Sequence, residues 1–212
     1  MAIPISHPFV ASLYDSVVGV GDRLFLASLR DEVATDLSGS VLEIGSGTGS
    51  MLKPIERCRR SDVPLNYIGI EPDRSMRERS RDRLQSVDFP VETILARGEA
   101  LPFPDDTFDT VLCSLVLCTV EDIERTLGEI ARVLVPAGDL LVLEHVAAKG
   151  IEGAIQRTIG PAWSSMTGGC DPHRKTAELI LATKQFHRVE AERRPVGIPP
   201  IRPFLIGRYR LS

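Results

Sequence analysis

The amino-acid pattern indicates an α/β protein with a seven-stranded, mostly parallel sheet and helices on both faces. From residue 41 onward, short apolar runs rich in β-branched residues alternate with helical patterns, as is typical of parallel strands joined by crossover helices. With 212 residues, 43% of them hydrophobic, the chain can bury one sizeable core. The excursion at 193–203 holds several prolines and no helical pattern, so we expect the last strand to return antiparallel to its neighbours.

Seven runs are expected to form strands, and the third and fourth lack the helical period and carry β-branched residues at strand length. The fifth is apolar almost throughout, which suits a strand buried on both faces. In chain order, the expected strands are 41–45, 67–71, 91–96, 108–117, 139–146, 186–192 and 204–212.

Helical patterns fill the connections. Apolar residues recur at i, i+4, i+7 and i+11 from Ile123, which predicts an amphipathic helix at 121–134. Asp171 followed by Pro172 suits an N-cap and a first turn, which predicts a helix at about 172–184. Two further helices are expected, one from the glycine-rich turn to about residue 60 and a solvated one at 73–84.

Composition argues against several classes of protein. The net charge is −4 and the basic residues are scattered, so we expect no nucleic-acid partner. No apolar run approaches the roughly 18 residues of a membrane span, and we expect a cytoplasmic protein with at most peripheral membrane contact. The cysteines have no C-x-x-C spacing, which favours reduced thiols packed as small hydrophobes and no metal site. Oligomeric state leaves no signal in the sequence.

The strongest local signal is VLEIGSGTGS at 41–50, where three glycines follow a strand and open a helix. Glycines at such a turn let the backbone bend sharply and approach a ligand closely. Glu71 ends the second strand 22 residues after Gly49, where a carboxylate can accept hydrogen bonds from ribose hydroxyls. This combination predicts a nucleotide-like ligand.

Two ligand classes share this geometry. A dinucleotide fingerprint reads G-x-G-x-x-G/A, whereas the spacing here is G-x-G-x-G, with Ser50 at the last dinucleotide position. Glu43 precedes the glycines, and its carboxylate would repel a pyrophosphate but suit an ammonium group. These details favour S-adenosylmethionine over NAD.

From these residues onward, the sequence resembles the class I S-adenosylmethionine-dependent methyltransferases over roughly 41–145. RGEALPFPDDTFDTVLCSL (97–115) is similar to the family's stretch from the adenine contact into the fourth strand, and EIARVLVPAG (129–138) to its next helix and turn. The resemblance implies a Rossmann-like fold. It also implies cofactor contacts from Glu43, Gly45, Gly47, Gly49, Glu71, Met76, Gly98, Glu99 and Ser114.

One departure from the family pattern concerns the adenine. Members often read G-D-A-E-x-L-P-F before the fourth strand, with the Asp contacting the adenine amine, and here Arg97 stands in its place. Because a guanidinium cannot accept a hydrogen bond, we expect backbone at Gly98 and Glu99 to make that contact, or the contact to be lost.

A closer resemblance covers the second half. LVLCTVED (115–122), LEHVAA (143–148) and GPAWSSMTGGC (160–170) look like the alkyl-thiol methyltransferase-like family, relatives of the quinone-biosynthesis C-methyltransferases. We expect a single methyltransferase domain in four parts. These are a helical lid (1–38), a cofactor-binding half (39–146), a substrate-side insertion (147–170) and a final helix with two strands (171–212).

Candidate residues for binding the acceptor lie at the end of the cofactor-binding half, in the insertion and just after it. His145 ends the fifth strand and is a candidate general base, although a structural, hydrogen-bonded histidine fits equally well. Trp163 and Met166 are expected to line an apolar pocket, with His173 as a further candidate. The favoured function is methylation of a small hydrophobic acceptor, with a thiol as one possibility. The alternatives are methylation of a quinone or phospholipid precursor at a membrane surface, and a non-catalytic module that binds S-adenosylmethionine.

Overall fold

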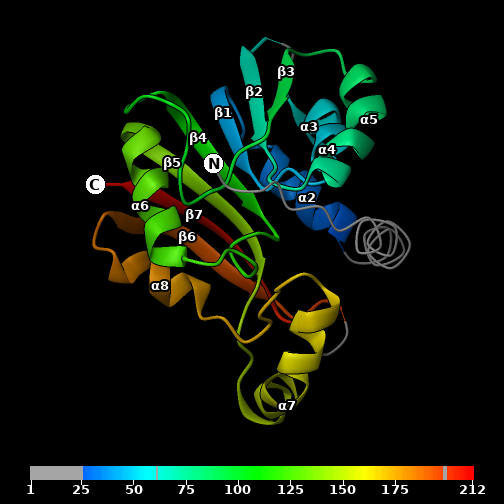
Figure 1. Cartoon of the computed structure of the whole chain (residues 1–212). Helices are drawn as coiled ribbons and strands as arrows, with labels where there is room; N and C mark the ends of the chain where they lie inside the picture. Colours follow the sequence, from blue (N-terminus) through cyan, green and yellow to red (C-terminus); the bar gives the residue numbers. More distant parts are fainter. Residues whose placement is uncertain (1–25, 61, 198–199) are drawn as a thin grey trace.

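The computed structural model describes residues 26–60, 62–197 and 200–212. One sheet runs in the order β3-β2-β1-β4-β5-β7-β6 (Figure 1). β7 is antiparallel to β5 and β6, and the other pairs are parallel, which confirms the expected fold and the direction of the last strand. The strands are β1 (Gly39–Ile44), β2 (Leu65–Ile70), β3 (Val91–Ile94), β4 (Phe108–Ser114), β5 (Leu134–His145), β6 (Phe186–Arg194) and β7 (Phe204–Leu211).

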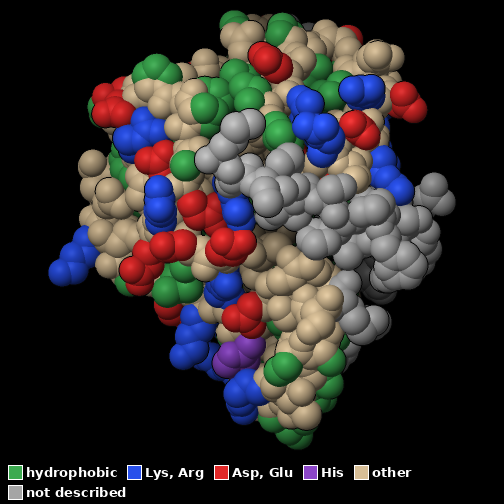
Figure 2. All heavy atoms as spheres, in the orientation of Figure 1, with side chains coloured by type: hydrophobic (Ala, Val, Ile, Leu, Met, Phe, Trp, Pro, Cys, Tyr) green, Lys and Arg blue, Asp and Glu red, His purple; other side chains and the backbone are tan. Residues whose placement is uncertain are grey.

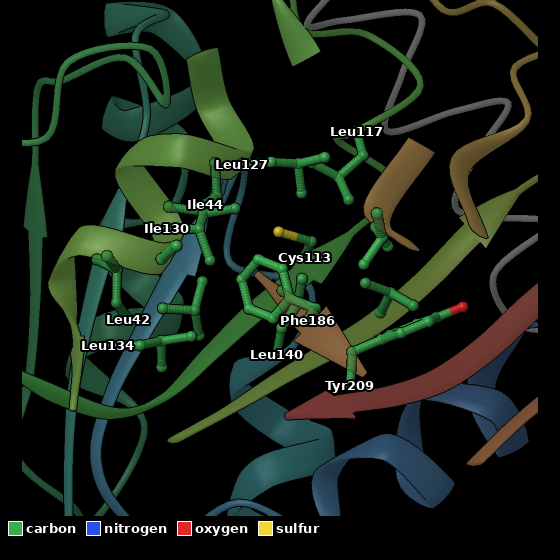
Figure 3. Close-up of a cluster of buried hydrophobic side chains, with 14 of the residues drawn as sticks. Leu42, Ile44, Cys113, Leu117, Leu127, Ile130, Leu134, Leu140, Phe186 and Tyr209 are labelled. Carbon is green, nitrogen blue, oxygen red and sulfur yellow. The ribbon is translucent and has the colours of Figure 1, made fainter. Parts of the chain in front are cut away.

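Helices cover both faces of the sheet, and alternate strand residues point to each face. Leu42 and Ile44 of β1 belong to the core that α6 and α8 cover, and Figure 3 shows part of this cluster. Val41 belongs to a second core beneath α2 and α3. The described helices are α2 (Ala27–Ala34), α3 (Leu52–Cys58), α4 (Arg74–Arg79), α5 (Arg81–Gln85), α6 (Ile123–Val133), α7 (Gly150–Met166) and α8 (Thr176–Ala182).

Two expected helices are wrong in their extent. The segment 73–84 is two helices, because the chain breaks at buried Ser80, whose hydroxyl donates to the carbonyl of Arg77. The last helix begins at Thr176 rather than near 172. Asp171 does not cap it: its carboxylate accepts the N–H of His173 inside a turn.

Strand ends also shift. β4 stops at Ser114, before the expected 117, because Leu115 takes a φ of 59° and turns the chain. β5 begins at Leu134, which pairs with Phe108, so the helix before it ends at Val133.

The expected insertion at 147–170 consists mainly of α7, which stands below the sheet rather than against either face (Figure 1). Gln156 anchors it. Its buried amide nitrogen donates to the carbonyls of Val146, Pro200 and Arg202, and its oxygen accepts the N–H of Ala148. Of the expected N-terminal lid, α2 and the residues up to 38 are described, and residues 1–25 lie outside the described chain.

A buried acid joins the first two strands. Glu43 of β1 is almost fully buried and accepts a hydrogen bond from the Tyr67 hydroxyl of β2. Burial raises the pKa of Glu43 to about 8, although the charge of Arg30 on α2 acts in the opposite direction. The folded chain therefore holds a proton on Glu43 at pH values where the unfolded chain has lost it.

We predict that this acid makes stability depend on pH. Because the folded-state pKa is raised, the contribution of Glu43 is fully present below about pH 4.5 and is lost as the pH rises toward 8. Glu43→Gln stays neutral and keeps an acceptor for Tyr67. The free energy of unfolding of this variant, relative to that of the parent, should therefore increase between pH 5 and 8, by up to about 1.4 kcal/mol per pH unit.

Urea unfolding of both proteins at several pH values measures this difference. Glu92→Gln, at an exposed position of β3, is the matched control and should run parallel to the parent. A constant difference between Glu43→Gln and the parent would show that Glu43 is ionised at all these pH values.

Candidate functional site

The glycine-rich turn after β1 forms one wall of the candidate site. Gly45, Gly47 and Gly49 all have positive φ, between 55° and 81°, which side chains rarely tolerate. A Cβ on Gly45 would lie 2.4 Å from the side chain of Val116, so the turn and the loop after β4 are in close contact. Among the described residues, a Cβ on Gly47 would meet only the carbonyl of Gly45, at 3.9 Å. The described part of the chain therefore leaves space beside the backbone at Gly47.

Glu71, just beyond β2, holds this turn in place. One carboxylate oxygen accepts the N–H of Gly47 at 2.9 Å, and the other accepts the N–H of Asp73 at 2.8 Å. Burial raises the pKa of Glu71 to about 7, while the two N–H donors oppose that shift. Each carboxylate oxygen has a second lone pair, so the group can still accept hydroxyl donors.

A second buried acid plays the same part at the other end of the site, and the sequence analysis missed it. Glu144 of β5 accepts the backbone N–H groups of Val116, Leu117 and Cys118 at 2.8, 2.7 and 3.3 Å. Burial raises the pKa of Glu144 to about 7, although these donors lower it. The available signal was an acid inside a strand otherwise apolar enough to be buried.

The residues expected beside the adenine lie on α4 and in the loop after β3. Met76 is half-buried in α4, and Gly98 is buried, with Thr126 and Ile44 at the position a Cβ would take. The carboxylate of Glu99 accepts the N–H groups of residues 121 and 122, at 3.1 and 3.5 Å, and supports the loop before α6. The expected contact from the backbone of Glu99 to the adenine stays a prediction.

Arg97 and Glu43 each have a partner of their own. Arg97, at the position of the family's acid, pairs with Glu121. The carboxyl of Glu43, expected beside an ammonium group, contacts Tyr67 within the sheet.

Ser114 ends β4 with a buried hydroxyl that has no hydrogen-bond partner among the described residues. The hydroxyl of Ser114 and the carboxylate of Glu71 are polar groups that a nucleoside ligand can use, and the described residues leave space for it beside Gly47. The residues present therefore fit S-adenosylmethionine at this edge of the sheet.

On the acceptor side, three side chains that are far apart in sequence meet. The Sγ of Cys170 lies 3.5 Å from the Sγ of Cys118 and 3.9 Å from Nδ1 of His145. The ring of His145 also packs on Phe204, with centroids 5.4 Å apart. His145 thus contacts one thiol of a close pair, and the indole of Trp163, on α7, lies beside Cys170.

These contacts change how readily the three groups ionise. The hydrogen bond between Cys170 and Cys118, aided by His145, holds the pKa of the Cys170 thiol well below its usual range. The hydrogen bond to Cys170 and burial raise the pKa of Cys118. Burial acts against the charged form of His145, but the contact with Cys170 raises its pKa nonetheless. The cluster favours a thiolate at Cys170 next to a histidine.

Of the other expected acceptor residues, His173 lies in the turn between α7 and α8. Its Nε2 is 3.4 Å from the guanidinium of Arg157, and it lines a cavity of about 340 Å³ between α7 and the turn at 171–173. Met166 is the last residue of α7, and its side chain lies outside the described part of the structure.

Comparison with known proteins agrees with this geometry. A methyltransferase domain family matches residues 42–142. The thiol S-methyltransferase TMT1B of Rattus norvegicus is 30% identical over 192 residues, which are 88% of this chain and 76% of the relative. The ubiquinone/menaquinone biosynthesis C-methyltransferase UbiE of Marinomonas sp. is 40% identical over 132 residues, 61% of this chain and 52% of the relative.

Among solved structures, that of the [4+2]-cyclase SpnF matches with a TM-score of 0.71 and 19% identity, over 100% of this chain and 98% of that one. At this identity the match shows a common fold alone. The similarity to TMT1B extends over most of both chains. The protein therefore belongs to the class I S-adenosylmethionine-dependent methyltransferases, and S-adenosylmethionine is its cofactor.

Proposed function

We propose that this methyltransferase methylates the sulfur of a small apolar thiol. The observation that carries the proposal is the position of the cysteine and histidine cluster and Trp163 at the same edge of the sheet as the glycine turn. Val116 links the two regions, because its side chain packs against Gly45, where a Cβ would be, and it lies two residues before Cys118. The similarity to thiol S-methyltransferases supports the same acceptor class.

S-adenosylmethionine supplies an electrophilic methyl group on a sulfonium. The proposed role of Glu71 is to accept hydrogen bonds from the ribose, and that of the turn at Gly45, Gly47 and Gly49 is to let the cofactor approach the backbone. Met76, Gly98 and Ser114 are proposed as contacts on the nucleoside side. The chain contributes mainly position and exclusion of water, since in-line displacement gains most from alignment of the reacting atoms.

The acceptor's own chemistry favours a thiol. The thiol of cysteine has a pKa near 8.5, against about 10 for the phenol of tyrosine, so a thiol acceptor demands less help from a base than a comparable phenol. Trp163 provides apolar surface in α7 for a hydrophobic acceptor. His145 is already in contact with Cys170. A thiol acceptor suits this arrangement, because it needs less proton removal by His145 than a phenol or a carbon acceptor does.

A second candidate is a quinol-like ring or a lipid precursor taken from a membrane surface. The similarity to quinone-biosynthesis methyltransferases favours it. So does an exposed apolar stripe on α7, formed by Ile151, Ile155 and Ile159, at the end of the molecule where Figure 2 shows hydrophobic side chains. Among the described residues, no helix is long and apolar enough to cross a membrane. A carbon acceptor would need proton removal, for which His145 is the candidate base.

An acceptor screen separates the candidates. Purified protein is supplied with S-adenosylmethionine and with apolar thiols, phenols or quinols, and S-adenosylhomocysteine is measured. We expect turnover with the thiols. Turnover with quinols alone would establish the second candidate, and cofactor binding without turnover of any acceptor would indicate a non-catalytic binding module.

Glu71→Ala should weaken S-adenosylmethionine binding by about 1–3 kcal/mol, the scale for hydrogen bonds to a charged group. The variant also releases the N–H of Gly47 from its partner. Calorimetry measures the affinity, with Glu78→Ala, at an exposed position of α4, as the control. An affinity equal to that of the parent would remove Glu71 from the cofactor site.

Trp163→Ala should lower kcat/KM for an apolar acceptor at least about tenfold, since a buried aromatic contact is worth more than about 1.4 kcal/mol. S-adenosylmethionine affinity should stay within about twofold, because the indole lies on the acceptor side, beside Cys170. Ile159→Ala on the exposed stripe is the matched control in the same helix. Unchanged kcat/KM in Trp163→Ala would place the acceptor elsewhere.

The second candidate carries its own prediction. If the acceptor is drawn from a bilayer, the protein should co-sediment with phosphatidylcholine vesicles, and Ile151→Asp should reduce the bound fraction, because a charge opposes burial among lipid tails. Glu124→Asp, on a surface helix away from α7, is the control. Equal sedimentation of Ile151→Asp and the parent would exclude α7 as the contact.

A further inference from the structure

The cluster of Cys118, His145 and Cys170 has the dimensions of a metal site. The three possible ligand atoms lie within 4.8 Å of one another, and all three residues are buried. The Sγ–Sγ distance is 3.5 Å and the Sγ–Nδ1 distance is 3.9 Å. Zinc bonds of about 2.3 Å to sulfur and 2.0–2.1 Å to nitrogen place tetrahedral ligand atoms roughly 3.4–3.8 Å apart. These two pairs are close to that spacing, and the Cys118–His145 pair lies within 4.8 Å.

Backbone contacts fix the position of each ligand. The N–H of Cys118 donates to Glu144, and its carbonyl accepts the N–H of Asp171, the residue after Cys170. His145 pairs with Phe204 in the sheet. The guanidinium of Arg174 also donates to the carbonyls of Leu117 and Val120, which ties the two cysteine-bearing segments together. Backbone contacts therefore hold the three residues in place, in addition to the contacts between their side chains.

The ligand set suits zinc. Thiolate and imidazole ligands favour zinc over magnesium or calcium. Two thiolates and a neutral imidazole would balance the charge of a divalent ion, which matters because an uncompensated charge is costly to bury. Three protein ligands leave one of four positions open, as in catalytic rather than structural zinc sites.

We propose that Cys118, His145 and Cys170 bind a zinc ion whose open position takes the acceptor as a thiolate. The choice of a thiol as fourth ligand rests on the proposed function, whereas the zinc site itself does not. Coordination to zinc deprotonates a thiol, and the proton passes to solvent. The thiolate sulfur then forms a bond to the methyl carbon as the bond from that carbon to the sulfonium breaks, which yields a methyl thioether and S-adenosylhomocysteine.

Zinc binding is tested on the full chain purified in the presence of a phosphine reductant. We expect about one tightly bound zinc per chain by elemental analysis. Cys118→Ser and Cys170→Ser should each weaken binding about 100-fold or more, measured by competition with a chromogenic chelator. Cys58→Ser is the matched control, because Cys58 is a free cysteine outside the cluster. Retained S-adenosylmethionine binding in each variant shows that it has folded.

Cobalt reports on the open position without any turnover. Cobalt substituted for zinc should give the visible bands of a four-coordinate thiolate site, and benzyl mercaptan should shift them while its S-methylated form does not. Reduced protein without stoichiometric zinc, or zinc binding that survives both serine substitutions, would overturn the site. A Cys118–Cys170 disulfide with no metal uptake after reduction would also overturn it, and would assign the pair to redox chemistry instead.

The two proposals fail in different ways. If thiols are methylated equally fast after zinc removal, or leave the cobalt spectrum unchanged, the role of zinc in acceptor binding is wrong and the proposed function stands. If zinc binds as expected but no thiol is methylated, the proposed function is wrong and the metal site stands. A metal-bound His145 is no longer free to act as a base, so zinc binding also argues against the ring acceptor.

Discussion

The hydrogen bonds from three successive backbone N–H groups to the buried carboxylate of Glu144 are the contact on which the candidate site depends. They hold residues 116–118, which follow the end of β4 at Ser114, against the end of β5. This loop places Val116 against Gly45 on one side and Cys118 against Cys170 on the other. The cofactor side and the acceptor side therefore share one support, and a shift of the loop would move both.

Glu71 repeats this arrangement at the other end of the site, where it joins the turn after β1 to the end of β2. A buried carboxylate loses hydration, and its pKa rises accordingly, but backbone N–H donors recover part of that loss. Loops after parallel strands otherwise have few partners of their own. A carboxylate from a neighbouring strand satisfies several of their N–H groups at once and holds the carboxyl edge of the sheet in a defined shape.

The acceptor side is assembled differently, from α7 and the chain that follows it. Gln156 fixes the helix to backbone from two distant segments, while Arg174 fixes the following turn to the loop after β4. Cys170 lies between these two anchors. The thiol cluster is thus a consequence of how the insertion docks on the sheet, and the same docking leaves one face of α7 exposed with its three isoleucines.

Local pattern in the sequence was enough to determine the seven strands, the antiparallel return of the last one, and the glycine turn followed by an acid 22 residues later. Each of these depends on residue types close together in the chain: alternation of apolar runs, prolines that exclude a helix, and glycines at positive φ. Helix and strand ends were less well determined, because Ser80, Leu115 and Asp171 act through contacts that propensity does not include.

Only the tertiary structure decided which side chains meet. Cys118 and Cys170 are 52 residues apart, and no spacing rule along the chain brings them within 3.5 Å of each other. Glu144 looked like one polar residue in an apolar strand until its partners in the neighbouring loop were seen. The partners of Glu43 and Glu99, which are Tyr67 and the backbone at residues 121 and 122, were equally hidden. The physical reason is the same in each case: the partner is supplied by another strand or helix, and chain order carries no record of that contact.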